Sequence, residues 1–361
     1  MADTRAATGL TVQQWDDAFF MEYFDEVDFG DIMGDNENAI IQVKENLTKK
    51  KGDSVTFAFL NRLTNAATTG DDVLEGKEED MSSRSHKITV AKRRHAVRVS
   101  ESQEQFSAIG LRDACKPQLK NWSMENTRDT IIAQFGAIDG VLYVNATAGQ
   151  KNTWLTNNAD RVLFGKVKAN TVAGDHASSL LNIDAVNDTC TRAVVSLLKR
   201  MATLAAPKVR PVRDPGNRKR YYVMYVHPYA HRDLRTDMEG VLDDATASGG
   251  AESARLFEGG DLYWDGVIVK ELLDMPVYAG VGAAAIDVAP GYLLGAQAVG
   301  YAVARRWKTI TKEFDYGDKY GTAIDSIDGF AKLRFGTDPT TDTGITKDNG
   351  VVTWYGAAVA D

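Results

Sequence analysis

The stretch Tyr221–Arg235 reads YYVMYVHPYAHRDLR, and it joins two elements of different kinds. Residues Tyr221–Val226 form a continuous apolar, aromatic and β-branched run, which predicts a buried strand. Pro228 disfavours a helical conformation at His227, yet it suits the first turn of a helix, where its missing N–H leaves no bond unmade. We therefore expect the strand to end at His227 and a helix to continue through Tyr229–Arg235.

The same stretch contains two apparent chemical motifs, and the residues around each of them rule it out. HRDL resembles the start of a protein-kinase catalytic loop, but Met238 stands where that loop needs Asn, and no upstream glycine-rich loop or later DFG is present. His227 and His231 have the spacing of a metal pair, but Pro228 keeps His227 off the helix and no Glu stands beside it. The stretch is interpreted as a junction between a strand and a helix.

The rest of the chain gives no motif for catalysis or metal binding. It has no GxSxG, Walker or CxxC motif, and the adjacent carboxylates lie in polar, loop-like sequence where solvation is the simpler explanation. The residues considered are His86, His95, His176, Asp71-Asp72 and Asp243-Asp244. The sequence therefore indicates no active site, no metal and no cofactor.

Composition places the chain among soluble globular proteins. Of 361 residues, 43% are hydrophobic and 25% charged, and the net charge is −8. An acidic chain gains little from counterion release, which argues against a tight nucleic-acid binder. Cys115 and Cys190, the two cysteines, each lie in a helix-like segment and form no disulfide framework. The start lacks an apolar signal core, and Val288–Ala304 is too short and broken to span a bilayer, so a soluble cytoplasmic protein is expected.

Periodicity predicts a mixed architecture of the α+β class. Glu101–Phe135 has the apolar turns of one long helix, or of two helices joined at Pro117. Ile183–Leu204 is amphipathic, with Asp184 near the expected start of the helix. Phe330–Phe335 is a further expected strand.

A long charged excursion follows the alternating strand pattern of Val55, Phe57 and Phe59. Its tip is acidic and its return is basic, and a loop of this length is usually functional or disordered. The acidic residues are Asp71, Asp72, Glu75, Glu78, Glu79 and Asp80, and the basic ones are Arg84, Lys87, Lys92, Arg93, Arg94 and Arg98. The basic run suits a solvated strand face, contact with nucleic acid, or a hairpin that pairs its charges with neighbouring copies.

The region Val12–Val27 is predicted to be helical and holds many aromatic side chains among acidic ones. Such a helix packs on its own core or forms an arm that docks on another subunit, because exposed aromatic side chains favour burial. Trp15 and Phe19 are the residues assigned to that docking.

Taken in order, these segments resemble the major capsid proteins of tailed phages, in the family found in large-genome short-tailed phages with the Hong Kong 97 shell fold. The resemblance is carried by segments spread over most of the chain, and the match is weakest at Gly136–Asp175. The segments are LTKKKGDSV (Leu47–Val55), GDDVLEGKEED (Gly70–Asp80), RRHAVR (ending at Arg98), YVMYVHPYAHRDL (Tyr222–Leu234), EFDYGDKYGTAIDSIDGFAKLRF (Glu313–Phe335) and the closing DNGVVTWYGA.

The resemblance implies a structural protein with a defined order of domains along the chain. It implies an N-terminal arm at 1–46, an extended loop at 47–99, a peripheral domain with a long spine helix at 100–207, an axial domain at 208–312, and a return to the peripheral domain with a C-terminal tail at 313–361. Copies would form hexamers and pentamers of an icosahedral head that encloses double-stranded DNA, with portal and scaffolding or decoration proteins as partners and no membrane. No self-cleaving protease and no cofactor is implied.

Contacts between copies are expected at the arm and the charged excursion. The residues are Trp15, Phe19, Asp71, Asp72, Glu75, Glu78, Glu79, Arg84, Lys92, Arg93 and Arg94. Reversing Arg93 and Arg94 to Glu is expected to impair assembly more than folding. The alternatives are a soluble enzyme whose site is scattered in sequence, and a nucleic-acid-binding module that uses Lys92–Arg94 and Lys208–Arg220.

Overall fold

The computed structural model describes most of the chain beyond its first 28 residues. The described residues are 29–45, 47, 52–60, 63, 65–70, 72–81, 83–106, 111–213, 219–247, 257–258, 261–336 and 345–359. The helix expected at Val12–Val27, with Trp15 and Phe19, lies outside them, as does Asp71.

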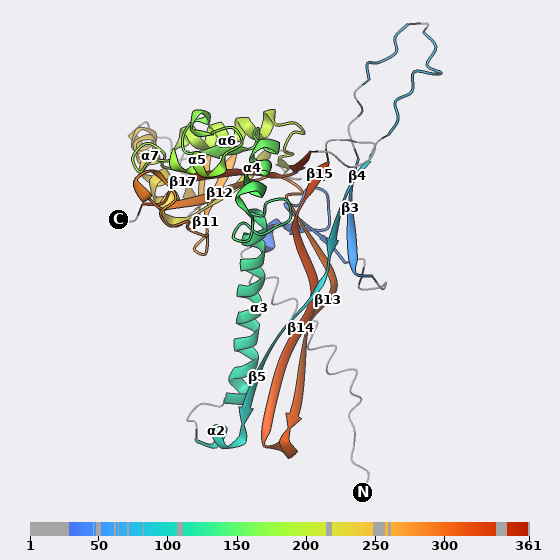
Figure 1. The fold of residues 1–361 in the computed structure, drawn as a ribbon, viewed down its shortest axis with the longest axis vertical. Coiled ribbons are helices and arrows are strands. Elements are labelled where there is room, and N and C mark those ends of the chain that lie inside the picture. Colours follow the sequence, from blue (N-terminus) through green and yellow to red (C-terminus); the bar gives the residue numbers. More distant parts are fainter. Residues whose placement is uncertain are drawn as a thin grey trace. The chain divides into compact units, whose positions relative to one another are not determined.

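The chain divides into two compact units, each built from separate stretches of sequence (Figure 1). The first unit holds Met1–Val55, Ile88–Gln134 and Val299–Ala331. The second unit holds Thr56–Lys87, Phe135–Ala298 and Lys332–Asp361. Helices and strands are mixed in both, which confirms the α+β class.

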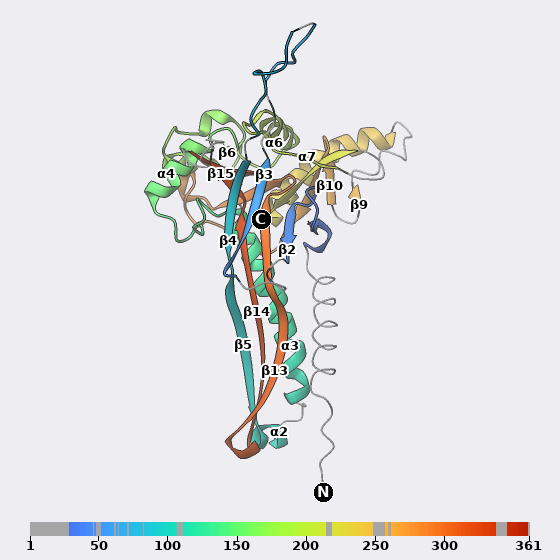
Figure 2. The same ribbon diagram turned by 90° about the vertical axis from the view of Figure 1, so that its right-hand side faces the viewer.

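The first unit is a five-stranded sheet with a long helix beside it (Figure 2). The strand order is β1 (Met33–Gly34), β2 (Ile41–Lys44), β13 (Val299–Phe314), β14 (Lys319–Lys332) and β5 (Ala91–Ser100). β5 and β14 are antiparallel along the whole length of β5, from Ser100 opposite Lys319 to Ala91 opposite Asp328. The basic residues from Lys92 to Arg98 therefore lie on a paired strand and not in a loop, whereas Arg84 and Lys87 lie on β4.

One continuous helix, α3 (Leu111–Phe135), packs against this sheet, and Pro117 lies inside it. The sequence had left open a break at Pro117. The separate short helix is instead α2 (Glu101–Phe106). Trp122 of α3 stacks on His95 of β5 with ring centroids 4.6 Å apart, and it meets Trp307 of β13 edge-on at 6.1 Å. These rings hold the helix on the sheet.

The second unit is built on an eight-stranded mixed sheet. Its order is β6 (Val162–Phe164), β17 (Val351–Ala357), β12 (Val288–Leu294), β8 (Arg220–Val226), β11 (Val267–Glu271), β10 (Asp261–Trp264) and β9 (Phe257–Glu258), with β7 (Val212–Arg213) also on β8. Its helices are α4 (Ala148–Asn157), α5 (His176–Leu181), α6 (Arg192–Leu204) and α7 (Pro228–Ala247). Two small sheets pair β15 (Arg334–Gly336) with β16 (Thr346–Asp348), and β3 (Ser54–Leu60) with β4 (Ser83–Thr89).

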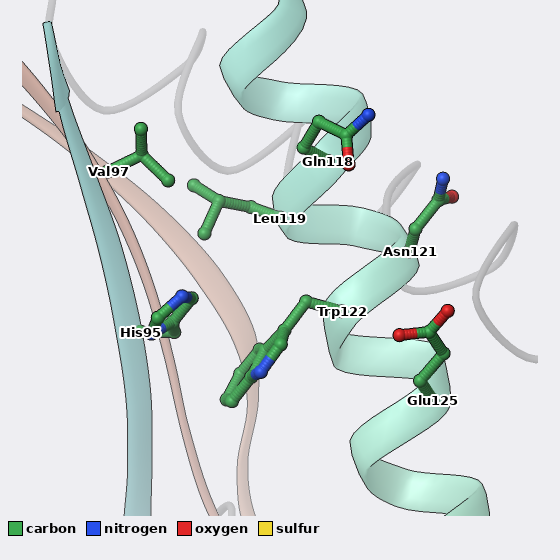
Figure 3. A pocket seen from close by; sticks show the side chains of 7 residues that line it. All are labelled: His95, Val97, Gln118, Leu119, Asn121, Trp122 and Glu125. Carbon is green, nitrogen blue, oxygen red and sulfur yellow. The ribbon is translucent and has the colours of Figure 1, made fainter.

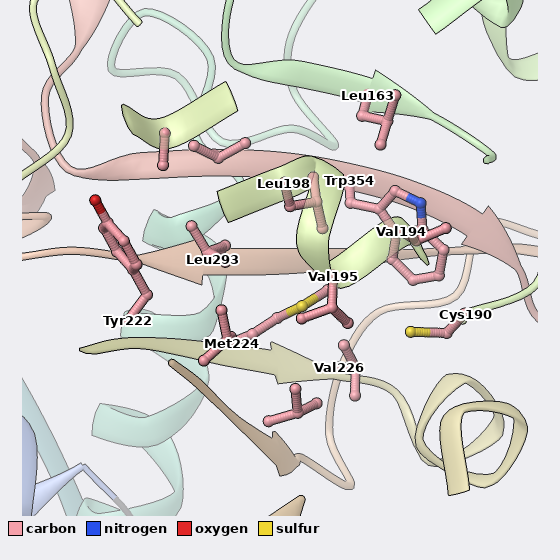
Figure 4. Close-up of a cluster of buried hydrophobic side chains, with 14 of the residues drawn as sticks. Leu163, Cys190, Val194, Val195, Leu198, Tyr222, Met224, Val226, Leu293 and Trp354 are labelled. Carbon is pink, nitrogen blue, oxygen red and sulfur yellow. The ribbon is translucent and has the colours of Figure 1, made fainter. Parts of the chain in front are cut away.

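The central strands of this sheet and helix α6 enclose an apolar core (Figure 4). Val194, Val195, Leu198 and Met201 of α6 are buried, and their spacing places them on one helix face. They meet side chains of β8, β12 and β17, among them Met224, Leu293 and Trp354. Burial at both faces explains why β8, β12 and β17 are continuous apolar runs in sequence.

The helix α6 begins later than predicted. Asp184 accepts hydrogen bonds from the backbone N–H of Val186 (2.9 Å) and Asn187 (2.6 Å), which stabilises a turn in place of a helix start. Cys190 therefore precedes α6 instead of lying in a helix, whereas Cys115 lies in α3 as expected. Both cysteines are buried and free.

The strand-to-helix junction at His227 is confirmed. β8 ends at Val226 and α7 begins at Pro228, but α7 continues to Ala247, well beyond Arg235. Asp243 and Asp244 thus lie in a helix and not in loop-like sequence. The expected strand Phe330–Phe335 is also different, because it spans the end of β14 and most of β15.

The compact units divide the chain differently from the predicted domain ranges. Residues 135–207 fall with residues 208–298 in the second unit, and Ala91–Ser100 joins the sheet of the first. Within the described part of the chain, no helix is both long and apolar enough to cross a membrane.

Candidate functional site

The acidic tip of the excursion, Asp72, Glu75, Glu78, Glu79 and Asp80, is a folded turn between β3 and β4 (Figure 1). The backbone N–H of Lys77 donates to the Leu74 carbonyl at 3.0 Å, and Gly76 has φ +88°, a conformation that other residues rarely adopt.

Carboxylates of the acidic tip stabilise this turn. Glu78 Oε2 accepts the N–H of Gly76 at 2.6 Å, Glu79 Oε2 accepts that of Asn65 at 2.8 Å, and Asp72 pairs with Lys77 at 2.9 Å. Glu75 and Asp80 are exposed. The tip therefore presents negative charge on an ordered turn.

The cations of the basic run point to two different faces of the sheet. Arg93 Nη1 donates to Asn126 Oδ1 of α3 at 2.9 Å, so Arg93 points toward the helix. Side chains alternate along a strand, so Lys92, Arg94 and Arg98 project from the opposite face, and all three are exposed. Their face is the one that α3 does not cover.

A buried carboxylate organises this second face. Asp325 lies directly across from Arg94 in the β5–β14 pairing and is 5% exposed. Its Oδ2 lies 2.5 Å from Arg305 Nη2 and 3.3 Å from Lys92 Nζ. We call Lys92, Arg94, Arg98, Arg305 and Asp325 the basic sheet face. Because it carries four cations and one carboxylate, it is complementary to an acidic surface.

Arg93, which the sequence assigned to contacts between copies, forms contacts within its own chain. Its guanidinium forms a two-bonded ion pair with Asp328 of β14, and it lies over the ring of Trp307 at 5.4 Å. The Arg93 side chain is 19% exposed and that of Asp328 is 1% exposed. Arg93 thus ties β5, β14 and α3 together within one chain, and reversing its charge should damage folding directly.

The other predicted contact residues are only partly brought together. Arg84 lies on β4 and is half-buried, whereas Lys92 and Arg94 lie on the basic sheet face. Asp71, Trp15 and Phe19 lie outside the described residues.

A shallow groove of about 320 Å³ runs beside β5 and α3 in the first unit (Figure 3). The stacked rings of His95 and Trp122 form its floor, and Gln118, Asn121 and Glu125 make its rim polar. A polar rim around an aromatic pair is typical of a surface that contacts another protein.

The histidines of the junction serve local structure. The backbone N–H of Tyr229 donates to His227 Nδ1 at 3.3 Å, and His231 Nδ1 lies 3.6 Å from Glu271. Burial lowers the pKa of His227, and the charge of Glu271 opposes that shift. Among the described residues, no three His, Cys, Asp or Glu side chains lie close enough together to hold a metal ion.

The sequence reasoning missed the buried carboxylates that pair with basic side chains. Asp325 and Asp328 were noted only within the segment Glu313–Phe335 that carries the resemblance, although two acids within the otherwise apolar TAIDSIDGF were a signal. In the second unit, Asp348 lies 2.7 Å from Lys332 Nζ and accepts the indole N–H of Trp154 at 3.0 Å. A buried carboxylate needs such partners to remain charged.

Comparisons with known proteins agree over nearly the whole chain. The profile of a family described as "Phage capsid protein" matches residues 3–360. A major capsid protein of Pseudomonas phage KPP25 is 25% identical over 342 residues, which cover 90% of this chain and 89% of that protein. A chain of the cyanophage Pam1 capsid asymmetric unit is 27% identical with a TM-score of 0.80, over 100% of both chains. A chain of the Ralstonia phage GP4 capsid has a TM-score of 0.72 at 23% identity, over 91% of this chain and 90% of that one.

Proposed function

Because the chain belongs to the phage capsid protein family, we propose that it is the major capsid protein of a tailed phage. Its fold is the Hong Kong 97-like capsid fold, which agrees with the resemblance in the sequence. Copies of the chain assemble as hexamers and pentamers into an icosahedral head around double-stranded DNA. The chain's part in this is structural, and the proposal assigns it no catalytic step.

The observation that supports the proposal most is that one chain has two separate surfaces of opposite charge. The acidic tip is exposed on a turn, and Lys92, Arg94 and Arg98 of the basic sheet face are exposed on a paired strand. We place the acidic tip of one copy on the basic sheet face of the next. Because each copy uses two different surfaces, the same contact repeats from one copy to the next. The copies form a closed ring when the rotation between neighbours brings the last copy back to the first.

Weak charged contacts suit a shell. Exposed ion pairs each contribute about 0–1 kcal/mol, so no single contact fixes the angle between copies. Many such contacts act together once a ring forms, because each further contact is then intramolecular. One chain can therefore occupy slightly different settings in hexamers and pentamers.

The domain assignments follow from the same proposal. The first unit, with α3 as spine helix, corresponds to the peripheral domain, and the eight-stranded sheet of the second unit corresponds to the axial domain. The excursion around β3 and β4 is the extended loop, and residues before about 46 form the arm. Portal and scaffolding or decoration proteins are the further partners, and assembly takes place in the cytoplasm of the bacterial host.

In this proposal the shell encloses the packaged DNA, and the chain does not bind it tightly. A net charge of −8 per chain disfavours tight binding to the phosphate backbone. Steeply salt-dependent DNA binding by the unassembled chain would contradict this part of the proposal.

Negative-stain electron microscopy of the expressed chain, taken from density-gradient fractions, tests the proposed function. Closed shells, tubes or rings of capsomers are expected, with or without the neighbouring phage proteins. A chain that stays monomeric under every condition would overturn the proposal.

A further inference from the structure

The second unit contains a pocket of about 510 Å³ that the proposed function leaves unused. It lies between the loop at Tyr143, the first turn of α4, helix α5 and the loop at Tyr278–Val281. The rings of Tyr143 and Tyr278 stack at 4.3 Å, and Leu180, Leu181 and Val281 add apolar wall. Leu181 is 57% exposed. An apolar pocket with aromatic walls is a typical site for an anchoring side chain.

One wall of the pocket holds a buried nitrogen that lacks a hydrogen-bond partner. His176 begins α5, is 2% exposed, and lines the pocket. Its ring lies within about 5–6 Å of the rings of Phe164 (5.4 Å) and Tyr355 (5.3 Å). Among the described residues its Nε2 atom has no hydrogen-bond partner. Leaving such an atom unsatisfied is unfavourable, so an occupant that donates a hydrogen bond to it is favoured.

A cation lies at the same pocket. Lys151 of α4 lines it, with Nζ 3.8 Å from the centroid of the Tyr143 ring. The ammonium favours an occupant that brings negative charge. The pocket thus suits an aromatic side chain with an N–H or O–H group, flanked by carboxylates.

A segment near the start of the chain has this chemistry. Tyr316 is also exposed beside a carboxylate, but that carboxylate, Asp315, is already paired with Lys319 at 2.7 Å. Aromatic residues are 9% of the chain, but they fill five of the 16 positions of VQQWDDAFFMEYFDEV, residues 12–27. The segment has five acidic residues and no Lys or Arg. Trp15 is followed directly by Asp16 and Asp17, whereas the exposed apolar residues of the excursion, such as Val73 and Leu74, include no aromatic ring.

We propose that Trp15 of a neighbouring copy docks in this pocket, with Asp16 and Asp17 close to Lys151. The indole ring lies against Tyr143 and Tyr278, and its N–H donates to Nε2 of neutral His176 in the Nδ1–H tautomer. This inference rests on the proposed function, because it takes the neighbouring copy from the shell. It names a pocket for the arm that is separate from the contact between the acidic tip and the basic sheet face.

Disulfide trapping in assembled particles tests this docking. The chain suits the method because Cys115 and Cys190 are both buried. Ala18→Cys keeps Trp15 intact, and Ala177→Cys places a thiol on an exposed residue of the pocket lining. The matched control combines Ala18→Cys with Val186→Cys, which is 81% exposed in the same unit but does not line the pocket.

The expected result is a non-reducing ladder of linked chains for the Ala177 pair and at least tenfold less linkage for the Val186 pair. Linkage within single chains only, equal linkage in both pairs, or intact shells without linkage would each overturn the inference. Intact shells without linkage would leave the proposed function standing, whereas a wild-type chain that forms no shells would overturn the proposed function itself.

A charge reversal gives a second readout that does not depend on the engineered thiol of the arm. Lys151→Glu in the Ala18–Ala177 cysteine pair is expected to lower the linkage yield several-fold. Lys168→Glu, which reverses an exposed charge in the same unit but outside the pocket, is expected to leave the yield unchanged. Equal yields from the two reversals would contradict the docking of acidic residues near Lys151.

Discussion

Arg93 and Arg94 are adjacent in sequence and have opposite roles in the structure. Arg93 points toward α3, where it pairs with the buried Asp328 and contacts Asn126. Arg94 points to the other face of the same strand and is exposed. The pleat of β5 thus separates a charge that holds the fold from a charge that is available to another copy.

This comparison shows that a run of like charges need not be one surface. In sequence, RRHAVR is a single basic block, and both arginines were assigned to contacts between copies. In the structure only the alternate positions Lys92, Arg94 and Arg98 share an exposed face. Experiments that reverse both arginines together would mix a folding defect with an assembly defect.

The largest effect is expected from Asp328→Ala. The substitution leaves the guanidinium of Arg93 largely buried without its carboxylate, and breaking such a pair costs about 3–5 kcal/mol. Denaturant unfolding should show this loss in the free energy of unfolding. Asp72→Ala, which removes an exposed partner of Lys77, is the control and should change that free energy far less. A change at Asp328 as small as that of the control would refute the role given to Arg93.

The buried ring of His176 in the second unit makes the stability of the fold depend on pH. Burial, and to a lesser degree the charge of Lys151, lowers the pKa of His176 from 6.5 to about 4, while Asp175 opposes the shift. The unfolded chain therefore binds the proton first, and stability is lost as the pH falls from about 6.5 to about 4. The loss is roughly 3 kcal/mol for that shift.

His176→Phe should remove this part of the pH dependence of stability. Phe keeps an aromatic ring against Phe164 and Tyr355, and it does not titrate. Urea unfolding of the wild type and the variant at pH 7 and at pH 4.5 measures it. The same acid sensitivity in the wild type and the Phe variant would contradict the assignment to His176.

Arg94→Gln, which removes an exposed charge without placing a negative charge opposite Asp325, should change folding little and assembly strongly. An exposed substitution is expected to alter the free energy of unfolding by no more than about 0.5 kcal/mol. The yield of particles in a density gradient should nevertheless fall severely, because each copy repeats the lost contact. A stability loss comparable to that of Asp328→Ala would show that the two faces of β5 are not separate in function.

The smallest effect concerns salt. Contacts between the acidic tip and the basic sheet face are exposed, and ions screen exposed charges beyond about 10 Å at 0.1 M ionic strength. The rate of capsomer association, followed by light scattering, should fall several-fold between low and high salt. Thermal unfolding of the separate chain should change far less, because the Arg93–Asp328 pair is buried. Association that is independent of salt would remove the electrostatic basis of the proposed contact.

Much of the architecture could be predicted from local patterns. The junction at His227 follows from a buried run and one proline, and the apolar face of α6 follows from the spacing of Val194, Leu198 and Met201. The order of quoted segments also predicted the capsid fold. Each of these signals lies within a few neighbouring residues.

The rest depends on pairings across long stretches of chain. Arg93 and Asp328 are 235 positions apart, so no local pattern could indicate that β5 joins β14. The pocket at Tyr143 and His176 likewise combines three separate segments, one of them in the region where the resemblance in sequence is weakest. The start of α6 was missed for a local reason, because Asp184 suits both a helix cap and the turn that it forms.

The most direct test is a charge-swap measurement of particle yield. One variant reverses Glu75 and Asp80 of the acidic tip to Lys, a second changes Arg94 to Gln and Arg98 to Glu, and a third carries all four changes. Density gradients and negative-stain microscopy would compare them with the wild-type chain. The account predicts shells from the wild type, few from either single reversal, and recovery in the combined variant. Shells at the wild-type level from both single reversals would contradict it.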